Sequence, residues 1–557
     1  MVFVFMVFSS QVFAQTLQWA KQIGGSSADN SYSVAVDALG NVYTAGSFVG
    51  TVDFDPGPGT FNITSFSYDA FISKLDASGN FVWAKNFGGN NGYAESYCIA
   101  IDTFGNVYTT GFFEYTVDFD PDLGVFNLTS TPSWGDAFIS KLNSSGNFVW
   151  AKLLGGNGEN IGISITTDDS GYVYSTGYFQ GTGDFDPGTG VYNLSALGYE
   201  DVYVSKLDSS GNFVWTKQLG GSGSILEETG YDIIVDDSGN VYTSGVHDNW
   251  ADFDPGLGTY MLNNWGGFIC KLNSSGNFAW AKHIESVPYW ASSSIALDNA
   301  NNLYVTSSFF DTCTTFNFIS AGGQDAFVAK FDSSGNFIWA KQLGSPFDDY
   351  GLSLTLDDSA HIYVKGEFSG TIDLDPGSGS FNLTPTGSRD FFITKWDSSA
   401  NFIWGGQIEG FSGSNGYYND GSSITTDITG SVYTTGSFSG VGDFDISNGV
   451  FNMTSNGNAD VAIVKMASLP NGVTELKSKL TFNISPNPSS GIFTVTSQDE
   501  ITAIEIYNVL GELIFPLSSR RGAGGEVEIN LSAQAKGIYF IKVQCGDKVS
   551  TQKIIIE

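Results

Sequence analysis

The chain has 557 residues and a formal net charge of −35, with 58 acidic and 23 basic side chains. Hydrophobic residues make up 41% of the sequence, which is enough for a packed core and excludes global disorder. The acidic excess argues against binding to nucleic acid or to an anionic membrane surface, because both need clustered Lys and Arg. The 69 glycines and the 15% aromatic content are typical of an all-β protein.

The N-terminus begins with an apolar run of eight residues, and the small residues Val12 and Ala14 follow it. This pattern predicts a signal peptide, residues 1–14, with cleavage after Ala14. Because no Lys or Arg precedes the apolar run, a buried first strand is the alternative. No stretch reaches the roughly 18 apolar residues that a membrane-spanning helix needs.

One phrase then recurs through residues 15–468. Its marker tryptophans are Trp19, Trp83, Trp150, Trp215, Trp280, Trp339 and Trp404. Spacings of 59 to 67 residues predict a repeat architecture. In the first period, alternation and turn signals predict strands at 33–37, 41–48, 69–75 and 81–85, with tight turns joining the first two and the last two. Four antiparallel strands per repeat are the blade of a β-propeller.

The strand counts predict how the ring closes. A Gly-Asn-Val-Tyr type strand and a Phe-Ile-Ser-Lys type strand each occur seven times. The Trp strand also occurs seven times, but it opens the chain at Trp19 and is absent after Lys465. The last blade therefore lacks a fourth strand, which residues 17–22 can supply. We expect an all-β fold in which a seven-bladed propeller over residues 15–468 is closed by the N-terminal strand.

The repeated phrases resemble a known family. Residues 40–48 (GNVYTAGSF) and 71–85 (FISKLDASGNFVWAK) are similar to the bacterial SBBP β-propeller repeat. The likeness recurs seven times and covers about four-fifths of the chain. It implies a propeller in an extracellular setting and no established activity.

The repeat ends at a predicted linker, residues 469–478, and residues 479–557 are predicted to form a small β-sandwich. Residues 476–557 carry eight basic and eight acidic side chains, so the excess of −35 lies on the propeller side. Stretches at 484–491, 506–511, 537–540 and 553–556 resemble the C-terminal sorting domain of type IX secretion in the Bacteroidetes. The resemblance implies export by that machinery, then removal of the domain with surface attachment or release. An ordinary adhesion-type sandwich is the alternative.

The expected strand order places both tight turns of every blade on one face of the ring. The other face, called here the long-loop face, receives the segment between the second and third strands and the link between blades. Long loops on a rigid scaffold concentrate binding residues, so this face is the candidate functional face.

The long segments carry an Asp-x-Asp phrase in six blades. Its members are Asp53 and Asp55, Asp118 and Asp120, Asp184 and Asp186, Asp252 and Asp254, Asp373 and Asp375, and Asp443 and Asp445. Two carboxylates on one side of a strand, next to a Pro-Gly turn, could contribute to Ca²⁺ sites that backbone and water oxygens complete. Alternatively, these aspartates cap turns by accepting hydrogen bonds from nearby N–H groups.

An active site should break the repeat, because one site needs one set of residues. A second aspartate opens the third strand in six blades, so it is expected to be a structural cap. The three histidines, His247, His283 and His361, are expected in different blades, and the chain has no Gly-x-Ser-x-Gly or His-Glu-x-x-His motif. We therefore expect no enzyme, with a secreted polysaccharide hydrolase or lyase as the alternative. Cys98, Cys270, Cys313 and Cys545 are far apart and are expected to be isolated.

Aromatic residues that break the repeat are candidates for ligand contacts, because exposed rings stack on sugars or anchor protein partners. They are Trp134, Trp250, Trp265, Tyr289, Trp290, Tyr417 and Tyr418. Local packing is the alternative for these rings. The sequence thus predicts a secreted or cell-surface scaffold that binds a glycan or protein and engages the type IX machinery through its tail. A purely structural surface component is a further alternative.

Overall fold

The computed structural model describes residues 15–557 except 90, 132–133, 223–227, 289–290, 292, 411–422, 448, 469–481, 498–500, 502, 509–512, 519–525 and 546–547. The predicted signal peptide and linker lie outside the described residues. The described secondary structure is β-strand, as predicted, and contains no helix, so no helix in it could span a membrane. The chain forms two compact units, Met1–Leu469 and Pro470–Glu557.

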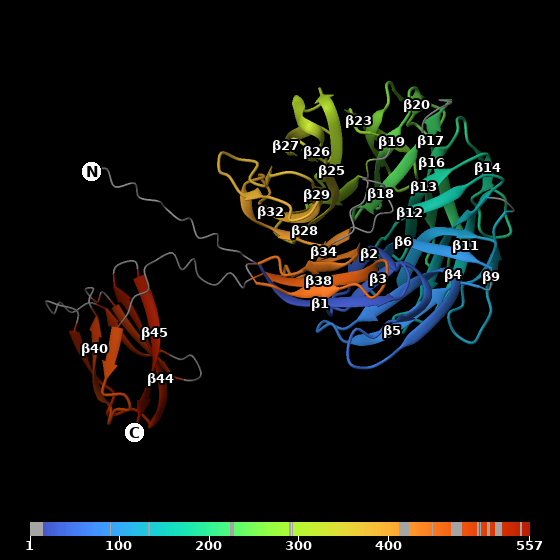
Figure 1. Cartoon of the computed structure of the whole chain (residues 1–557). Coiled ribbons are helices and arrows are strands. Elements are labelled where there is room, and N and C mark those ends of the chain that lie inside the picture. The colour runs from blue at the N-terminus through green and yellow to red at the C-terminus, as the bar shows by residue number, and fades with distance from the viewer. Residues whose placement is uncertain are drawn as a thin grey trace. The chain divides into compact units, whose positions relative to one another are not determined.

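The strands of the first unit pair as antiparallel meanders of four that follow the sequence repeat (Figure 1). The first strands are β2 (Asn30–Val36), β6 (Tyr93–Ile101), β12 (Asn160–Thr167), β18 (Thr229–Val235), β24 (Ser294–Leu297), β28 (Asp349–Leu356) and β34 (Ser423–Thr426). The second strands are β3 (Val42–Asp53), β7 (Val107–Glu114), β13 (Val173–Phe179), β19 (Val241–His247), β25 (Leu303–Cys313), β29 (Ile362–Phe368) and β35 (Val432–Phe438).

The third strands carry the repeated lysine. They are β4 (Asn62–Leu75), β10 (Asp136–Leu142), β16 (Asp201–Leu207), β22 (Gly266–Leu272), β26 (Phe318–Phe331), β32 (Asp390–Trp396) and β38 (Asp460–Ser468). The fourth strands carry the repeated tryptophan. They are β5 (Phe81–Phe87), β11 (Phe148–Gly156), β17 (Phe213–Gly221), β23 (Phe278–Glu285), β27 (Phe337–Leu343), β33 (Phe402–Ile408) and β1 (Gln15–Gly25).

The N-terminal strand β1 pairs with β38 near the end of the first unit. The antiparallel register runs from Gln15 opposite Ser468 to Ile23 opposite Val461. The far end of β1 pairs with β3 of the first meander. The first strands contact one another in chain order, and β34 also contacts β2. β1 thus fills in the last meander the place that a fourth strand fills in the others.

A repeated group of side chains, called here the turn joint, connects a meander to a tight turn of the next at five of the seven junctions. In the first meander, the Tyr43 hydroxyl donates to Asp37 Oδ2 at 3.0 Å, and Lys74 Nζ lies 4.7 Å from the centre of the Tyr43 ring. Lys74 Nζ also donates to the carbonyl of Ser144, in a tight turn of the next meander, at 3.4 Å. Trp83 packs edge-on against Tyr43. The joint tyrosine is fully buried in all seven meanders and lies under its lysine in each.

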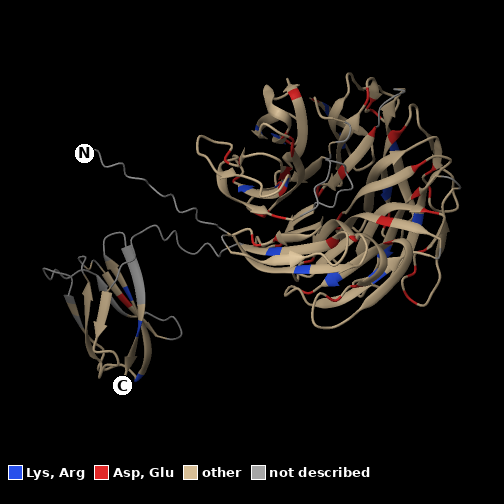
Figure 2. Ribbon diagram, viewed as in Figure 1, with Lys and Arg blue, Asp and Glu red and all other residues tan. Residues whose placement is uncertain are grey.

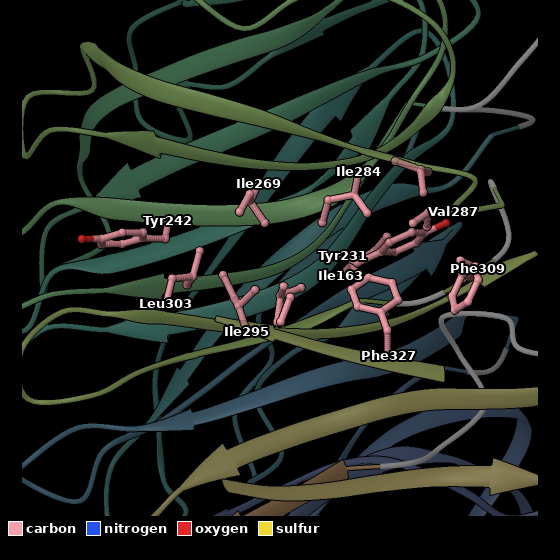
Figure 3. Packing of buried hydrophobic residues seen from close by; sticks show 14 of the residues in the cluster. Ile163, Tyr231, Tyr242, Ile269, Ile284, Val287, Ile295, Leu303, Phe309 and Phe327 are labelled. Atoms are coloured by element: carbon pink, nitrogen blue, oxygen red, sulfur yellow. The ribbon is translucent and has the colours of Figure 1, made fainter. Parts of the chain in front are cut away.

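The same joint links the last meander to the first. Lys465 Nζ and Trp19 Nε1 both donate to the carbonyl of Ala77, in a tight turn of the first meander, at 3.1 and 3.3 Å. Buried apolar side chains fill the space between neighbouring sheets. Figure 3 shows one such cluster, in which Ile163, Tyr231, Ile269 and Ile295 come from four different strands.

Short hairpins lie between the second and third strands. They are β8 (Thr116–Asp118) with β9 (Asn127–Thr129), β14 (Thr182–Asp184) with β15 (Asn193–Ser195), β20 (Ala251–Asp252) with β21 (Met261–Leu262), β30 (Ile372–Asp373) with β31 (Asn382–Leu383), and β36 (Val441–Asp443) with β37 (Asn452–Thr454). In the first meander, the end of β3 and the start of β4 form the equivalent hairpin.

The C-terminal unit has two antiparallel sheets. One contains β39 (Phe482–Ser485), β40 (Ile492–Ser497) and β43 (Glu526–Asn530), and the other contains β41 (Ala503–Asn508), β42 (Leu513–Ser518), β44 (Gly537–Cys545) and β45 (Lys548–Ile556). Phe493 from one sheet and Ile504, Ile541 and Ile554 from the other are buried in one core. This unit therefore has a small hydrophobic core of its own, to which no residue of the repeats contributes.

The pairing of β1 leads to a first prediction. Deleting residues 1–24 should lower the free energy of unfolding by more than about 4 kcal/mol, because it removes a packed strand and exposes the edge of β38. Urea denaturation followed by tryptophan fluorescence would measure the loss, and a synthetic 15–25 peptide added in excess should restore part of it. An unchanged unfolding midpoint in the shortened chain would contradict the prediction.

Candidate functional site

The Asp-x-Asp phrases lie in the short hairpins, and their carboxylates accept backbone hydrogen bonds. Asp53 Oδ1 accepts the N–H groups of Asp55 and Phe61 at 3.1 and 2.8 Å, and Asp55 Oδ1 accepts that of Gly57 at 2.8 Å. The two bonds to the first aspartate recur at Asp118, Asp184, Asp252, Asp373 and Asp443. This is the geometry of the turn-capping alternative. No group of three or more His, Cys, Asp or Glu among the described residues could hold a metal ion, and the calcium prediction for these loops stays a prediction.

The hairpins are held more firmly than free loops. Phe54, between the two aspartates of the first phrase, is fully buried. Phe61 packs on Phe81 of the outer strand β5, with ring centres 4.8 Å apart, and four other hairpins repeat this pair. In addition, β14 and β20 pair with the fourth strands of the preceding meanders. Much of the segment predicted as a long free loop is therefore anchored to the outer strands.

The predicted ligand-contacting aromatics fall into three groups. Trp134 and Trp250 are exposed, at 53% and 64% of their surface. Trp265 is half-buried and stacks on Phe310, with ring centres 5.5 Å apart and planes 12° apart, as the packing alternative proposed. The remaining four, Tyr289, Trp290, Tyr417 and Tyr418, lie outside the described residues.

The exposed aromatics that the sequence reasoning missed include Phe66, Phe347 and two tyrosines. Tyr115 is 62% exposed and Tyr199 is 56% exposed. Tyr115 has a left-handed backbone, with φ of 63°, at the position that Gly50 and Gly440 occupy in other meanders. The equivalence is set by a shared bond, because the N–H of each of these residues donates to the serine fifteen positions later. The detectable signal was the replacement of a repeated glycine by tyrosine.

Tyr115, Trp134, Tyr199 and Trp250 form what we call the aromatic arc. All four lie between a second and a third strand, in the second, third and fourth meanders. Trp250 also has a left-handed backbone, with φ of 68°. A bulky residue in this conformation is strained by about 1–2 kcal/mol, and such outliers cluster at functional sites. The arc is therefore the candidate binding surface. Figure 2 marks the Asp and Glu positions of this unit in red, on its strands as well as its loops.

A cavity of about 230 Å³ lies where the first strands meet. Residues from all seven first strands line it, and equivalent positions carry Ser33, Cys98, Ser164, Asp232, Ser294, Ser353 and Ser423. Asp232 breaks this serine and cysteine pattern. It accepts hydrogen bonds from Ser164 Oγ and from the N–H of Ile295, both at 2.8 Å, and burial raises its pKa. Its bonds cross to the meanders on both sides, so Asp232 serves chiefly to join them.

The expectation that the three histidines lie in different blades was wrong. His247 of β19 and His283 of β23 belong to one meander, and His247 Nε2 lies 2.9 Å from His283 Nδ1. Burial lowers the pKa of His247 to about 3 and, with the second imidazole, keeps it neutral. His283 occupies the position of Gln218 in β17, and Gly266 replaces the aspartate that Gln218 contacts. The histidine pair thus substitutes for a structural contact of the repeat.

Comparisons with known proteins agree with this architecture. Residues 18–47 and 214–246 match a family described as beta-propeller repeat. Residues 483–557 match the secretion system C-terminal sorting domain. The chain thus carries propeller repeats followed by a type IX sorting tail, which indicates a secreted or cell-surface protein.

Individual relatives are distant. An uncharacterized WD repeat-containing protein, L264, of Acanthamoeba polyphaga mimivirus is 25% identical over 475 residues, which are 69% of this chain and 34% of that protein. The regulatory protein FlaEY of Caulobacter vibrioides is 29% identical over 122 residues, 20% of this chain and 13% of that protein. The chain thus spans about a third of the first relative and about an eighth of the second. Among solved structures, Sqt1 from Chaetomium thermophilum has 10% identity and a TM-score of 0.37, over 80% of this chain and 98% of that one.

The strained backbone at Tyr115 gives a second prediction. Replacing Tyr115 with Gly should raise the free energy of unfolding by about 1 kcal/mol, because glycine adopts the left-handed conformation without strain. Chemical denaturation of the full chain would measure the change, with Phe104→Gly, at an exposed position in a tight turn, as the control. If Tyr115→Gly destabilises the chain, the ring contributes to packing and the arc loses its main support.

Proposed function

We propose that this protein is a binding scaffold of the cell surface or its surroundings, in which a closed seven-bladed propeller presents the aromatic arc to a glycan. The observation that carries the proposal is the pair of exposed rings, Tyr115 and Trp250, held in left-handed backbone where a glycine would be unstrained. Maintaining two exposed, strained aromatics lowers stability, and a binding role gives a reason for keeping them.

Three features support a closed ring of seven blades. β1 pairs with β38, the joint at Ala77 repeats the joints between other meanders, and the central cavity takes lining residues from every first strand. Closure would leave no unpaired edge at the ends of the repeat. The arc would then sit on a rigid ring, which limits the entropy lost when a ligand binds.

The charge distribution favours an uncharged ligand. Of the 15 basic residues before position 476, 13 are repeated strand lysines, so the loops are almost purely acidic. An anionic polymer would be repelled, whereas a neutral sugar offers C–H faces to the rings and hydroxyls to the carboxylates. Both repeat-breaking histidine contacts described, His247 with His283 and His361 with Asp357, replace structural contacts of the repeat, which favours binding over catalysis.

The binding proposal leads to a third prediction. When the full chain is tested for binding to a panel of neutral and charged polysaccharides, it should bind the neutral ones. Changing Tyr115, Trp134, Tyr199 and Trp250 to Ala should reduce the affinity for these glycans by at least about tenfold. This corresponds to a loss of roughly 1.4 kcal/mol of binding free energy. Phe104→Ala is the matched control, because Phe104 is 76% exposed in a tight turn.

Other outcomes would decide between the alternatives. If the four substitutions leave glycan binding unchanged, the aromatic arc is not the binding site. Release of reducing ends from a retained glycan would identify an enzyme. Capture of a protein, with no glycan retained, would replace the glycan as the ligand.

The sorting tail gives a fourth prediction. A chain ending at residue 470 should fold and keep its ligand binding but remain unsecreted in a host with the type IX machinery, because the export signal lies in residues 483–557. Immunoblots of cell and medium fractions would measure this. Normal export of the shortened chain would contradict it.

A further inference from the structure

A second set of repeated contacts buries carboxylates in pairs between neighbouring meanders. Each pair joins the aspartate of a third strand to an acidic residue at or just before the next first strand. The pairs are Asp201 with Glu228, Asp460 with Asp29, and Asp325 with Asp349. All six side chains are at least 97% buried. None of the six forms an ion pair with a basic side chain among the described residues.

Each pair has oxygens that are satisfied and oxygens that are not. Glu228 Oε2 accepts the N–H of Gly221 at 2.9 Å, and Asp201 Oδ2 accepts that of Leu197 at 3.1 Å and the amide of Gln218. Their other oxygens, Glu228 Oε1 and Asp201 Oδ1, are buried with no hydrogen-bond partner in the described structure. The same is true of Asp29 Oδ1, Asp460 Oδ1 and Asp325 Oδ1.

The two members of a pair occupy one small space. A Cβ added to Gly220 would lie 2.2 Å from Glu228 Oε2 and 2.7 Å from Asp201 Cγ, so both carboxyl groups pack around this glycine. Burial is the main cause that raises the pKa of Glu228 to about 9, and the charges of Asp201 and Asp248 add to it. The pKa values of Asp29 and Asp349 rise to about 7, again mainly through burial, with Asp460 and Asp325 adding to the effect.

One junction shows how the contact looks when an acid is replaced by an amide. Between the second and third meanders, Asn160 stands where the three pairs have their second acid; between the first and second, Ala94 stands there and Asp69 Oδ1 has no hydrogen-bond partner. Asn160 Nδ2 donates to Asp136 Oδ1 at 2.8 Å, and Gly156 donates to the same oxygen at 3.1 Å. Both oxygens of Asp136 have donors there, since Thr131 donates to Oδ2 at 2.8 Å. The fold therefore tolerates a neutral hydrogen-bond donor at this position. In the three acid pairs the second carboxylate cannot donate, so their negative charge has to be neutralised by a cation or a proton.

We propose that the three carboxylate pairs are Ca²⁺ sites, with one ion bound at the unpartnered oxygens of each pair. Two such oxygens are present in the Asp201–Glu228 and Asp29–Asp460 pairs and one, Asp325 Oδ1, in the third, because both oxygens of Asp349 accept backbone N–H groups. Burying unpaired carboxylates is strongly unfavourable, and a bound cation removes that penalty. Ca²⁺ accepts six to eight oxygen ligands in flexible geometry, so backbone carbonyls and water would have to supply the remaining ligands, whereas Mg²⁺ requires a regular octahedron and loses its water reluctantly. These sites are separate from the Asp-x-Asp hairpins, whose first aspartates already accept two backbone hydrogen bonds.

The test is to count and locate bound calcium on the full chain. Equilibrium dialysis at pH 8 should give three Ca²⁺ per chain, and Glu228→Gln should reduce this to two. Asp136→Asn, at the amide junction, and the double change Asp53→Asn with Asp55→Asn should leave three. Binding of six ions, or loss of calcium in the Asp53 and Asp55 variant, would place the sites in the hairpins and overturn the proposal. Absence of binding at millimolar Ca²⁺ would also overturn it.

Melting experiments separate the cation from a proton as the neutralising charge. In EDTA, stability should fall as pH rises from 6 to 8, because raised carboxyl pKa values mean that the folded state binds more protons at pH 6 than the unfolded state. Millimolar Ca²⁺ should raise the melting temperature more at pH 8 than at pH 6, and more than Mg²⁺ at matched ionic strength. A melting temperature that responds to pH but not to Ca²⁺, or equally to both ions, would overturn the proposal in favour of protons or general screening.

Discussion

The turn joint is the contact on which the first unit depends. A buried tyrosine hydroxyl bonds an aspartate within its own meander, and the lysine above the ring donates into a tight turn of the next one, as Lys141 does to the carbonyl of Ser209 at 3.0 Å. The ring holds the ammonium group in place by cation–π attraction, and the turn carbonyl takes its hydrogen bond. Polar contacts of this kind connect neighbouring meanders at five junctions, whereas Lys330 and Lys395 bond Tyr304 and Asp357 of their own meanders.

Because the joint recurs, residues that follow the repeat have structural roles in packing the sheets together, and residues that break the repeat are the candidates for functional roles. The repeated lysines, tyrosines and tryptophans belong to the first group. Tyr115 and Trp250 belong to the second, because each places a ring in backbone that strains a side chain. The buried acids form an intermediate group. The third-strand aspartate obeys the repeat, whereas its partner, such as Glu228, varies from one junction to the next.

The sequence predicted the fold better than the site. Counting Trp19 against Lys465 was enough to expect that β1 would join β38, because strand pairing follows from the order of the repeats. The sequence could not decide what Asp53 does, since the outcome depends on whether nearby N–H groups already occupy its oxygens. Tyr115 was missed because the sequence shows only that it replaces a repeated glycine, and the left-handed backbone that makes this replacement costly is seen in the structure. The pairing of Asp201 with Glu228 was also hidden, because it needs the spacing between two meanders, and the residues just before Glu228 follow no repeat.

Hydrogen exchange at β1 tests the central claim, that the turn joints and the N-terminal strand hold the repeats in one closed ring. In such a ring, alternate amides among Ala20, Lys21, Gln22 and Ile23 donate to β38 within the last meander. They should exchange as slowly as those of the outer strands β5 and β11, measured by mass spectrometry on the full chain. Exchange of these amides at the rate of an unstructured peptide, while β5 and β11 stay protected, would contradict the account.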